Sequence, residues 1–186
     1  MLCKGKIVYE DIYGKSYRQK GNVEVDNNQF NSIEASGKVI FDSISANDII
    51  LKGSVAGKTI KADNIVLKGD IDIGSVSSSR VKIVFATSNT IKEIRATQSV
   101  EIKRGDFNFS GSFSLDIGVF HLSFDSTKHD NNSQFGIKKI IAPNIEISNC
   151  DIEYIECDSL IADGCHVKEL KCNRQKIENC HIDNFL

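Results

Sequence analysis

The sequence predicts an all-β protein, built as a triangular parallel β-helix (a solenoid) with about fifteen to sixteen residues in each coil. Three observations predict this fold. Glycines recur at every sixteenth position in the N-terminal part, apolar residues come in pairs two positions apart, and the C-terminal third repeats at every fifteenth position. Residues two positions apart share one face of a strand, whereas a helix requires spacings of three and four. A repeat of fixed length is the signature of an architecture made of stacked units.

The N-terminal repeat has a period of sixteen. Its glycines are Gly5, Gly21, Gly37, Gly53 and Gly69. Each is followed two positions later by an aliphatic residue, and two further pairs of mostly apolar residues complete the unit. The extra residue between two pairs turns a corner, so each unit is expected to form three short strands and three corners. Glycine is expected at a corner where the backbone turns tightly or adopts a positive φ.

The C-terminal repeat has a period of fifteen and is marked by cysteines. These form two columns: Cys150, Cys165 and Cys180, and Cys157 and Cys172. The corner positions Asn149, Gly164 and Asn179 match as well, and Asn and Gly tolerate a left-handed backbone best. A square coil with a period of twenty would stack Cys150 on Leu170, a poorer match, so the sequence favours the triangular coil.

The stretch between the two repeats is less regular. We expect a single solenoid domain over 1–186, divided into N-terminal coils 1–76, an irregular middle 77–136 and C-terminal coils 137–186. The run Ser77-Ser78-Ser79 reads as a linker, whereas 93–103 keeps the core spacing with one extra residue and is expected to form another coil.

A Phe-rich insertion is expected at 104–136, with a hairpin that turns at Gly111-Ser112. Its alternating apolar residues are Phe107, Phe109, Phe113 and Leu115. Such a face either covers the solenoid or forms a patch for a partner or a membrane surface.

The composition excludes several classes of function. With 23 Lys and Arg against 25 Asp and Glu, the net charge of −2 argues against a nucleic-acid partner. No apolar run approaches the ~18 residues of a membrane span, and the start lacks the apolar stretch of a secretory signal. We therefore expect a cytoplasmic protein whose six cysteines are reduced.

On these residues the chain resembles the bactofilins, bacterial polymer-forming cytoskeletal proteins built on a right-handed triangular β-helix. The segment SISANDIILKGSVAGKTIKADNIVLKGDI (43–71) shows the family's alternation of Ile-x-Ala, Ile-x-Leu and Gly-x-Val, and 141–170 and 78–94 resemble parts of longer Gram-positive members. The chain differs from many members in having no Pro-rich tail, and its Phe-rich insertion interrupts the array of coils.

The resemblance implies a right-handed helix and a non-enzymatic scaffold that polymerises through its ends and positions other proteins. Its first implied partner is a further copy of itself, in a homopolymer or homo-oligomer. Other bactofilin-like subunits, cell-envelope proteins and the inner face of the cell membrane are further candidate partners.

The ends of a solenoid are strand layers with unpaired backbone groups, which are either capped or used for stacking. The last segment, 180–186, carries apolar residues and no charged cap. The candidate self-assembly residues are Ile7, Tyr9, Ile182, Phe185 and Leu186. In the alternative interpretation, Phe185 simply closes the core as the last rung.

The cysteines are interpreted as a structural ladder of buried thiols, together with the corner glycines Gly21, Gly37, Gly53 and Gly69. Cys165-His166 and Cys180-His181 pair two common zinc ligands, but neighbours on a strand point to opposite faces and cannot bind one ion together. No metal or cofactor is therefore expected. A metal site and a regulatory disulfide remain as the lesser alternatives for the cysteines, and Cys3 stands outside the ladder.

No catalytic residue is expected. The chain contains no P-loop, dinucleotide fingerprint or nucleophile elbow, and none of His121, His129, His166 and His181 is expected to act as a partnered base. Two alternatives to the scaffold are a monomeric adaptor that uses the Phe-rich hairpin, and a hexapeptide-type acyltransferase. The acyltransferase is disfavoured because its aliphatic residues recur every six positions, whereas here steps of five and six are mixed.

Overall fold

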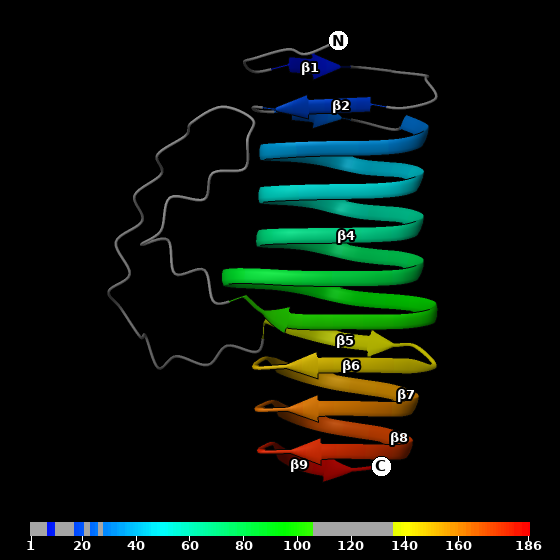
Figure 1. Cartoon of the computed structure of the whole chain (residues 1–186), viewed down its shortest axis with the longest axis vertical. Helices are drawn as coiled ribbons and strands as arrows, with labels where there is room; N and C mark the ends of the chain where they lie inside the picture. Colours follow the sequence, from blue (N-terminus) through cyan, green and yellow to red (C-terminus); the bar gives the residue numbers. More distant parts are fainter. Residues whose placement is uncertain (1–6, 10–16, 21–22, 26–27, 106–135) are drawn as a thin grey trace.

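The computed structural model describes residues 7–9, 17–20, 23–25, 28–105 and 136–186. In these residues the chain winds into one parallel β-solenoid, as Figure 1 shows, with β1 at one end of the stack and β9 at the other. The strands are β1 (Ile7–Tyr9), β2 (Tyr17–Lys20), β3 (Val23–Val25), β4 (Asn28–Arg104), β5 (Ile137–Ile141), β6 (Asn144–Ser148), β7 (Asp151–Asp163), β8 (His166–Glu178) and β9 (His181–Phe185). The predicted all-β solenoid is confirmed.

The coils are held together by parallel backbone pairing in register. In the N-terminal part Val23 of β3 pairs with Val39 of β4, which is one full repeat of sixteen further along the chain. In the C-terminal part Cys157 of β7 pairs with Cys172 of β8, which is one full repeat of fifteen further along. Both predicted periods are therefore the lengths of real coils, and equivalent residues lie directly above one another.

The core consists of the residues that point inward from three short faces in each coil. In one coil, for example, the inward residues are the buried Ile49, Leu51, Val55 and Ile60 with the half-buried Gly57 and Ala62. Fully burying one such aliphatic side chain is worth about 1.5–3 kcal/mol. At Gly57 an added Cβ would overlap the ring of Phe41 in the coil before it, so a small residue here makes room for a large one there.

The serine run does not form a linker, so that prediction is wrong. Ser77, Ser78 and Ser79 all belong to β4, and Ser78 is buried at the inward position that Ala62 holds one coil earlier. The Ser78 hydroxyl lies 3.0 Å from the carbonyl oxygen of Asp63 and 2.8 Å from that of Arg80, so its one O–H has an acceptor inside the stack.

The stack continues across the segment that separates the two repeats. The predicted coil at 93–103 is present, with Ile94, Ala96, Val100 and Ile102 buried. The described residues end at Gly105 and resume at Gly136, and across this interval Val100 pairs directly with Ile145. The coils before and after this junction are therefore neighbours in one array. Gly21, Cys3 and the predicted Phe-rich hairpin lie outside the described residues.

Corner residues show why glycine and asparagine recur. Gly37, Gly53 and Gly69 have φ values of 105°, 110° and 119°, while Asn149, Gly164 and Asn179 have φ values of 52°, 63° and 53°. The φ values of the three N-terminal glycines are unfavourable for any residue with a side chain. The φ values of the three C-terminal corners lie in the left-handed region, which Asn also adopts. Within the described part of the chain there is no helix of the length and apolarity needed to cross a membrane.

The two kinds of corner predict different tolerance to substitution. Gly53→Ala should lower the free energy of unfolding by about 1–3 kcal/mol, because its φ is unfavourable for any side chain and its Cβ would overlap the carbonyl oxygen of Gly37. Gly164→Asn should cost less than about 1 kcal/mol, since Asn already fills the equivalent corner at 149 and 179. Urea unfolding of both variants measures the difference. Equal stability of the two would contradict this account of the corners.

Candidate functional site

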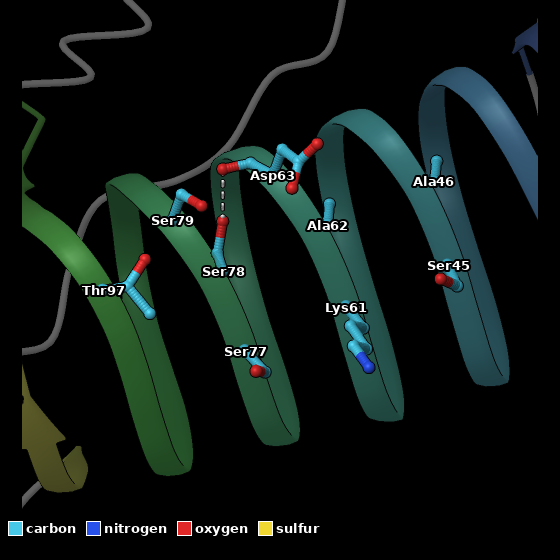
Figure 2. Close-up of a pocket in the computed structure, with 9 residues that line it drawn as sticks. All are labelled: Ser45, Ala46, Lys61, Ala62, Asp63, Ser77, Ser78, Ser79 and Thr97. Atoms are coloured by element: carbon cyan, nitrogen blue, oxygen red, sulfur yellow. Dashed lines mark hydrogen bonds between the residues drawn. The ribbon is translucent and has the colours of Figure 1, made fainter.

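An open groove of about 250 Å³ runs across four successive coils (Figure 2). Its lining residues are Ser45, Ala46, Lys61, Ala62, Asp63, Ser77, Ser78, Ser79 and Thr97. The groove exists because most of these side chains are small. Its lining offers hydroxyls, one ammonium and one carboxylate, but no histidine or thiol that could serve as base or nucleophile.

Among the described residues, part of the C-terminal layer of the solenoid is apolar and exposed. Phe185 pairs with Leu170 below it, but its side chain is 62% exposed, and that of Leu186 is 67% exposed. Cys180 and Ile182 are half-buried beside them. Phe185 is thus the last residue of the inward-pointing column that contains Leu170, and most of its surface is exposed to solvent.

One side of the same layer is polar. β9 covers only the first part of β8, and the remaining part exposes Arg174, Gln175 and Lys176. Gln175 stands at the inward position that Leu160 fills one coil earlier. The expected apolar end is therefore present at Phe185 and Leu186 but does not extend around the whole coil. At the opposite end β1 provides the backbone edge, and the side chains of Ile7 and Tyr9 lie outside the described residues.

The cysteine columns lie inside the stack. The sulfur atoms of Cys150 and Cys165 are 3.7 Å apart, and the backbone N–H of Cys165 donates to the sulfur of Cys180 at 3.3 Å. All these thiols are free. The hydrogen bond between Cys150 and Cys165 lowers the pKa of Cys165 to about 7 and raises the pKa of Cys150. Burial raises the pKa of Cys157, which pairs with Cys172 in the second column.

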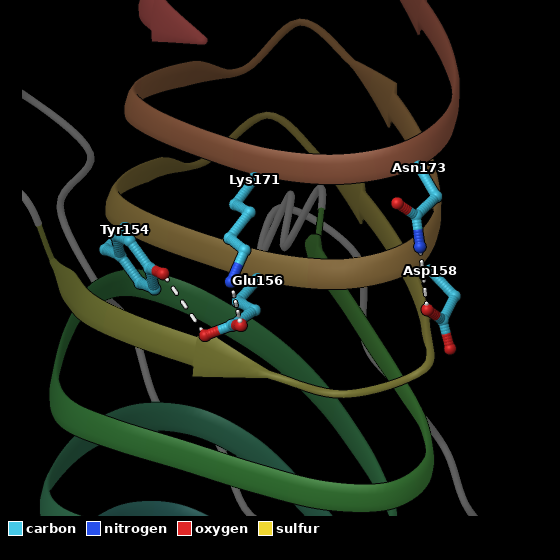
Figure 3. A network of polar contacts seen from close by, with 5 residues as sticks. All are labelled: Tyr154, Glu156, Asp158, Lys171 and Asn173. Carbon is cyan, nitrogen blue, oxygen red and sulfur yellow. Dashed lines mark hydrogen bonds and ion pairs between the residues drawn. The ribbon is translucent and has the colours of Figure 1, made fainter. Parts of the chain in front are cut away.

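The outer faces carry polar contacts from one coil to the next (Figure 3). The Lys171 ammonium donates to Glu156 at 2.8 Å, the Tyr154 hydroxyl donates to the same carboxylate at 3.2 Å, and Asn173 donates to Asp158 at 3.1 Å. The bond from Lys171 lowers the pKa of Glu156. These groups are solvated, so the network organises the face and contributes little to stability.

A further cluster lies on the outer face of the last two coils. The Nε2 atoms of His166 and His181 lie 3.0 and 3.1 Å from the same carboxylate oxygen of Asp183, and the two ring centroids are 5.1 Å apart. The hydrogen bond with His166 lowers the pKa of Asp183. Our sequence analysis missed this cluster, although the signal was present. The repeat that aligns Cys165 with Cys180 also aligns their neighbours His166 and His181, and Asp183 lies two positions further along the same face.

Neither sequence nor structure comparison connects the chain to a known protein: no family model, no curated protein and no solved structure matches it.

The predicted partner patch lies outside the described residues; its candidates are Phe107, Phe109, Phe113 and Leu115.

The cysteine environments predict an order of reactivity in the folded protein. With Cys3 replaced by serine, iodoacetamide should modify the half-buried Cys172 and Cys180 before Cys150, Cys157 and Cys165, because reagent access limits buried thiols. Peptide mass mapping at short times measures the order, and urea-unfolded protein, in which all sites react, is the control. If Cys165 reacted first, its low pKa rather than its burial would govern the chemistry.

The outer network predicts a shift in one carboxylate titration. Lys171→Met should raise the pKa of Glu156 toward its ordinary value, because the ammonium that stabilises the carboxylate is removed. Since the folded-state pKa lies below the unfolded one, the interaction stabilises the fold at neutral pH and is lost as the pH falls through the folded-state pKa. Carboxyl NMR titration measures the shift. Lys176→Met is the matched control, because Lys176 pairs with Glu178 and not with Glu156. If Lys176→Met raised the pKa of Glu156 as much as Lys171→Met does, the Lys171–Glu156 bond would not be the cause of the lowered pKa.

Proposed function

We propose that this protein is a non-enzymatic, bactofilin-like scaffold that assembles with further copies of itself through the ends of its solenoid and positions partner proteins. The observation that carries the proposal is the C-terminal layer, where an exposed apolar surface coincides with an edge of the described sheet. β9 pairs with β8 on one side and forms the edge of the sheet on the other. Phe185 and Leu186 are the most exposed of the large apolar side chains described.

The physical reason for assembly is that a single contact with a second copy would pair the strand edge of β9 and also cover the exposed apolar surface. A strand edge presents a row of unpaired N–H and C=O groups, which is a template for a further strand. An apolar layer gains about 25 cal/mol for each Å² that a second layer removes from water. A stacked copy would supply both the missing hydrogen bonds and the missing cover for Phe185.

The two edges of the stack also determine what kind of assembly can form. β1 and β9 stand at opposite ends of the strand order, so a β9-to-β1 contact joins unlike surfaces. Repeated contacts between unlike surfaces at opposite ends of a stack produce open filaments when the rotation does not close a ring, whereas a β9-to-β9 contact alone would stop at a dimer. Filaments are the outcome that the proposed scaffold requires.

Catalysis finds no support in the groove or in the cysteine columns. The groove lining contains no histidine or thiol, and the five described cysteines pack in the core columns instead of lining a cleft. A cytoplasmic scaffold with reduced thiols, near the inner face of the membrane or away from it, is compatible with these features. The monomeric adaptor depends on residues outside the described ranges, so no observation favours it over the scaffold.

The proposal predicts that a charge at the apolar end blocks assembly. Phe185→Asp should abolish concentration-dependent association, because a carboxylate would have to be buried in the stacked layer. The side chain is mostly exposed, so the monomer should keep its fold. Sedimentation velocity and negative-stain microscopy of the full chain provide the readouts, and circular dichroism checks the fold.

Ile161→Asp is the matched control, since Ile161 is 50% exposed on a side face instead of at the end. It should assemble like the unaltered chain. A wild-type protein that stays monomeric at high concentration, or a Phe185→Asp variant that still forms filaments, would refute assembly through this end.

A further inference from the structure

We propose that His166, His181 and Asp183 form a binding site for one divalent transition-metal ion of the zinc class, on the outer face of the last two coils. The site does not depend on the scaffold function proposed above, and it uses none of the cysteines. Both histidines come from equivalent positions in successive coils, and Asp183 follows His181 on the same face of β9.

The geometry of the three side chains fits a metal ion. Their ligand atoms all lie within 4.8 Å of one another, and the two Nε2 atoms are 3.0 and 3.1 Å from the Asp183 oxygen. In a tetrahedral zinc site with bonds of about 2.0–2.2 Å, two ligand atoms are roughly 3.3–3.5 Å apart. The two nitrogen–oxygen distances lie a few tenths of an ångström below this value, and the distance between the two histidine ligand atoms is at most 4.8 Å, so rotation of these exposed side chains would bring the three ligands around one ion.

A metal ion would take the place of the two hydrogen bonds that Asp183 accepts from His166 and His181. One carboxylate oxygen accepts from both rings, which requires a proton on each Nε2. A metal would replace both protons and use one lone pair from each of the three ligands. The side chains are 33%, 77% and 35% exposed for His166, His181 and Asp183, so an ion has a direct path from solvent.

The donor atoms of the three side chains determine which class of metal ion the site would bind. Asp151 lies in register beneath His166, and on the same face the Lys168 ammonium pairs with Glu153 at 3.7 Å. Two imidazoles and one carboxylate suit Zn²⁺, Co²⁺, Ni²⁺ or Cu²⁺ and not Mg²⁺ or Ca²⁺, which prefer oxygen ligands alone. Cys165 and Cys180 point to the opposite face of the same strands, into the core, so the ligand set contains no sulfur.

Metal binding at this position would fasten the last strand to the coil beneath it. His166 is in β8 and His181 and Asp183 are in β9, so the ion would add a bridge between two coils that already meet through backbone pairing, the Cys165 N–H bond to the Cys180 sulfur, and core packing. A ligand that binds only the folded state raises its stability in proportion to ln(1 + [L]/Kd). Three protein ligands leave at least one coordination position for water.

The test is metal titration of the full chain with Zn²⁺ and Co²⁺ as probes. Isothermal titration calorimetry should give one Zn²⁺ per chain, and Co²⁺ should give visible absorption bands of nitrogen and oxygen coordination without sulfur-to-metal charge transfer. His181→Gln and Asp183→Asn should each weaken Zn²⁺ binding at least about tenfold, since even outer-shell changes cost ~10–100-fold. Zinc should raise the thermal midpoint of the unaltered chain and not of His181→Gln.

Two matched controls locate the site. His129→Gln removes a histidine outside the described residues, and Cys180→Ser removes the nearest half-buried thiol; both should bind Zn²⁺ like the unaltered chain. No binding by the unaltered chain would overturn the proposal. So would binding that survives in both His181→Gln and Asp183→Asn, or that is lost in either control.

Discussion

Parallel backbone pairing between successive coils, held in register at the fixed step of the repeat, is the constraint from which the other features follow. It places every side chain above its equivalent one coil away. Most inward positions are therefore apolar in coil after coil, with Ser78 and Gln175 as exceptions. A corner must accept the same backbone conformation each time, as Gly37, Gly53 and Gly69 do. The same constraint puts His181 over His166, so a chemical cluster arises from positions that are far apart in sequence.

Stacking like on like creates a difficulty on the outer faces, because identical charges would repel one another along a column. In several columns the chain avoids this repulsion by placing groups of different charge at neighbouring positions, although Asp163 is in register with Glu178. Across coils it pairs carboxylates with ammonium or amide groups: Glu34 with Lys52, Asp42 with Lys58, Asp48 with Asn64, Glu156 with Lys171, and Asp158 with Asn173. Identical residues are stacked where they are uncharged, as with Cys157 on Cys172. The outer surface thus has a cross-coil pattern of its own, superimposed on the repeat of the core.

The sequence alone predicted the solenoid, both coil lengths and the coil at 93–103, because each depends on the spacing of apolar residues, which the backbone geometry translates directly into burial. Ser78 was misjudged because a run of serines was read by composition, whereas its place in the inward column of Ala62 decides its burial. The His166–His181–Asp183 cluster was missed because only sequence neighbours were considered as joint ligands. The polar side of the C-terminal layer at Gln175 required the structure, since it depends on how far β9 extends over β8.

The passage from Gly105 to Gly136 has a consequence for the order in which the chain folds. Through most of the stack each coil docks on the coil that directly precedes it in the chain, so contacts form over short chain segments, but Asn144 meets Gln98 across 46 residues. By the logarithmic cost of ring closure, joining ends that far apart is less favourable by about 1 kcal/mol than joining ends one coil apart. Growth of the stack from either half should therefore slow at this seam, and the two halves are natural candidates for separate cooperative units that merge in a late kinetic phase.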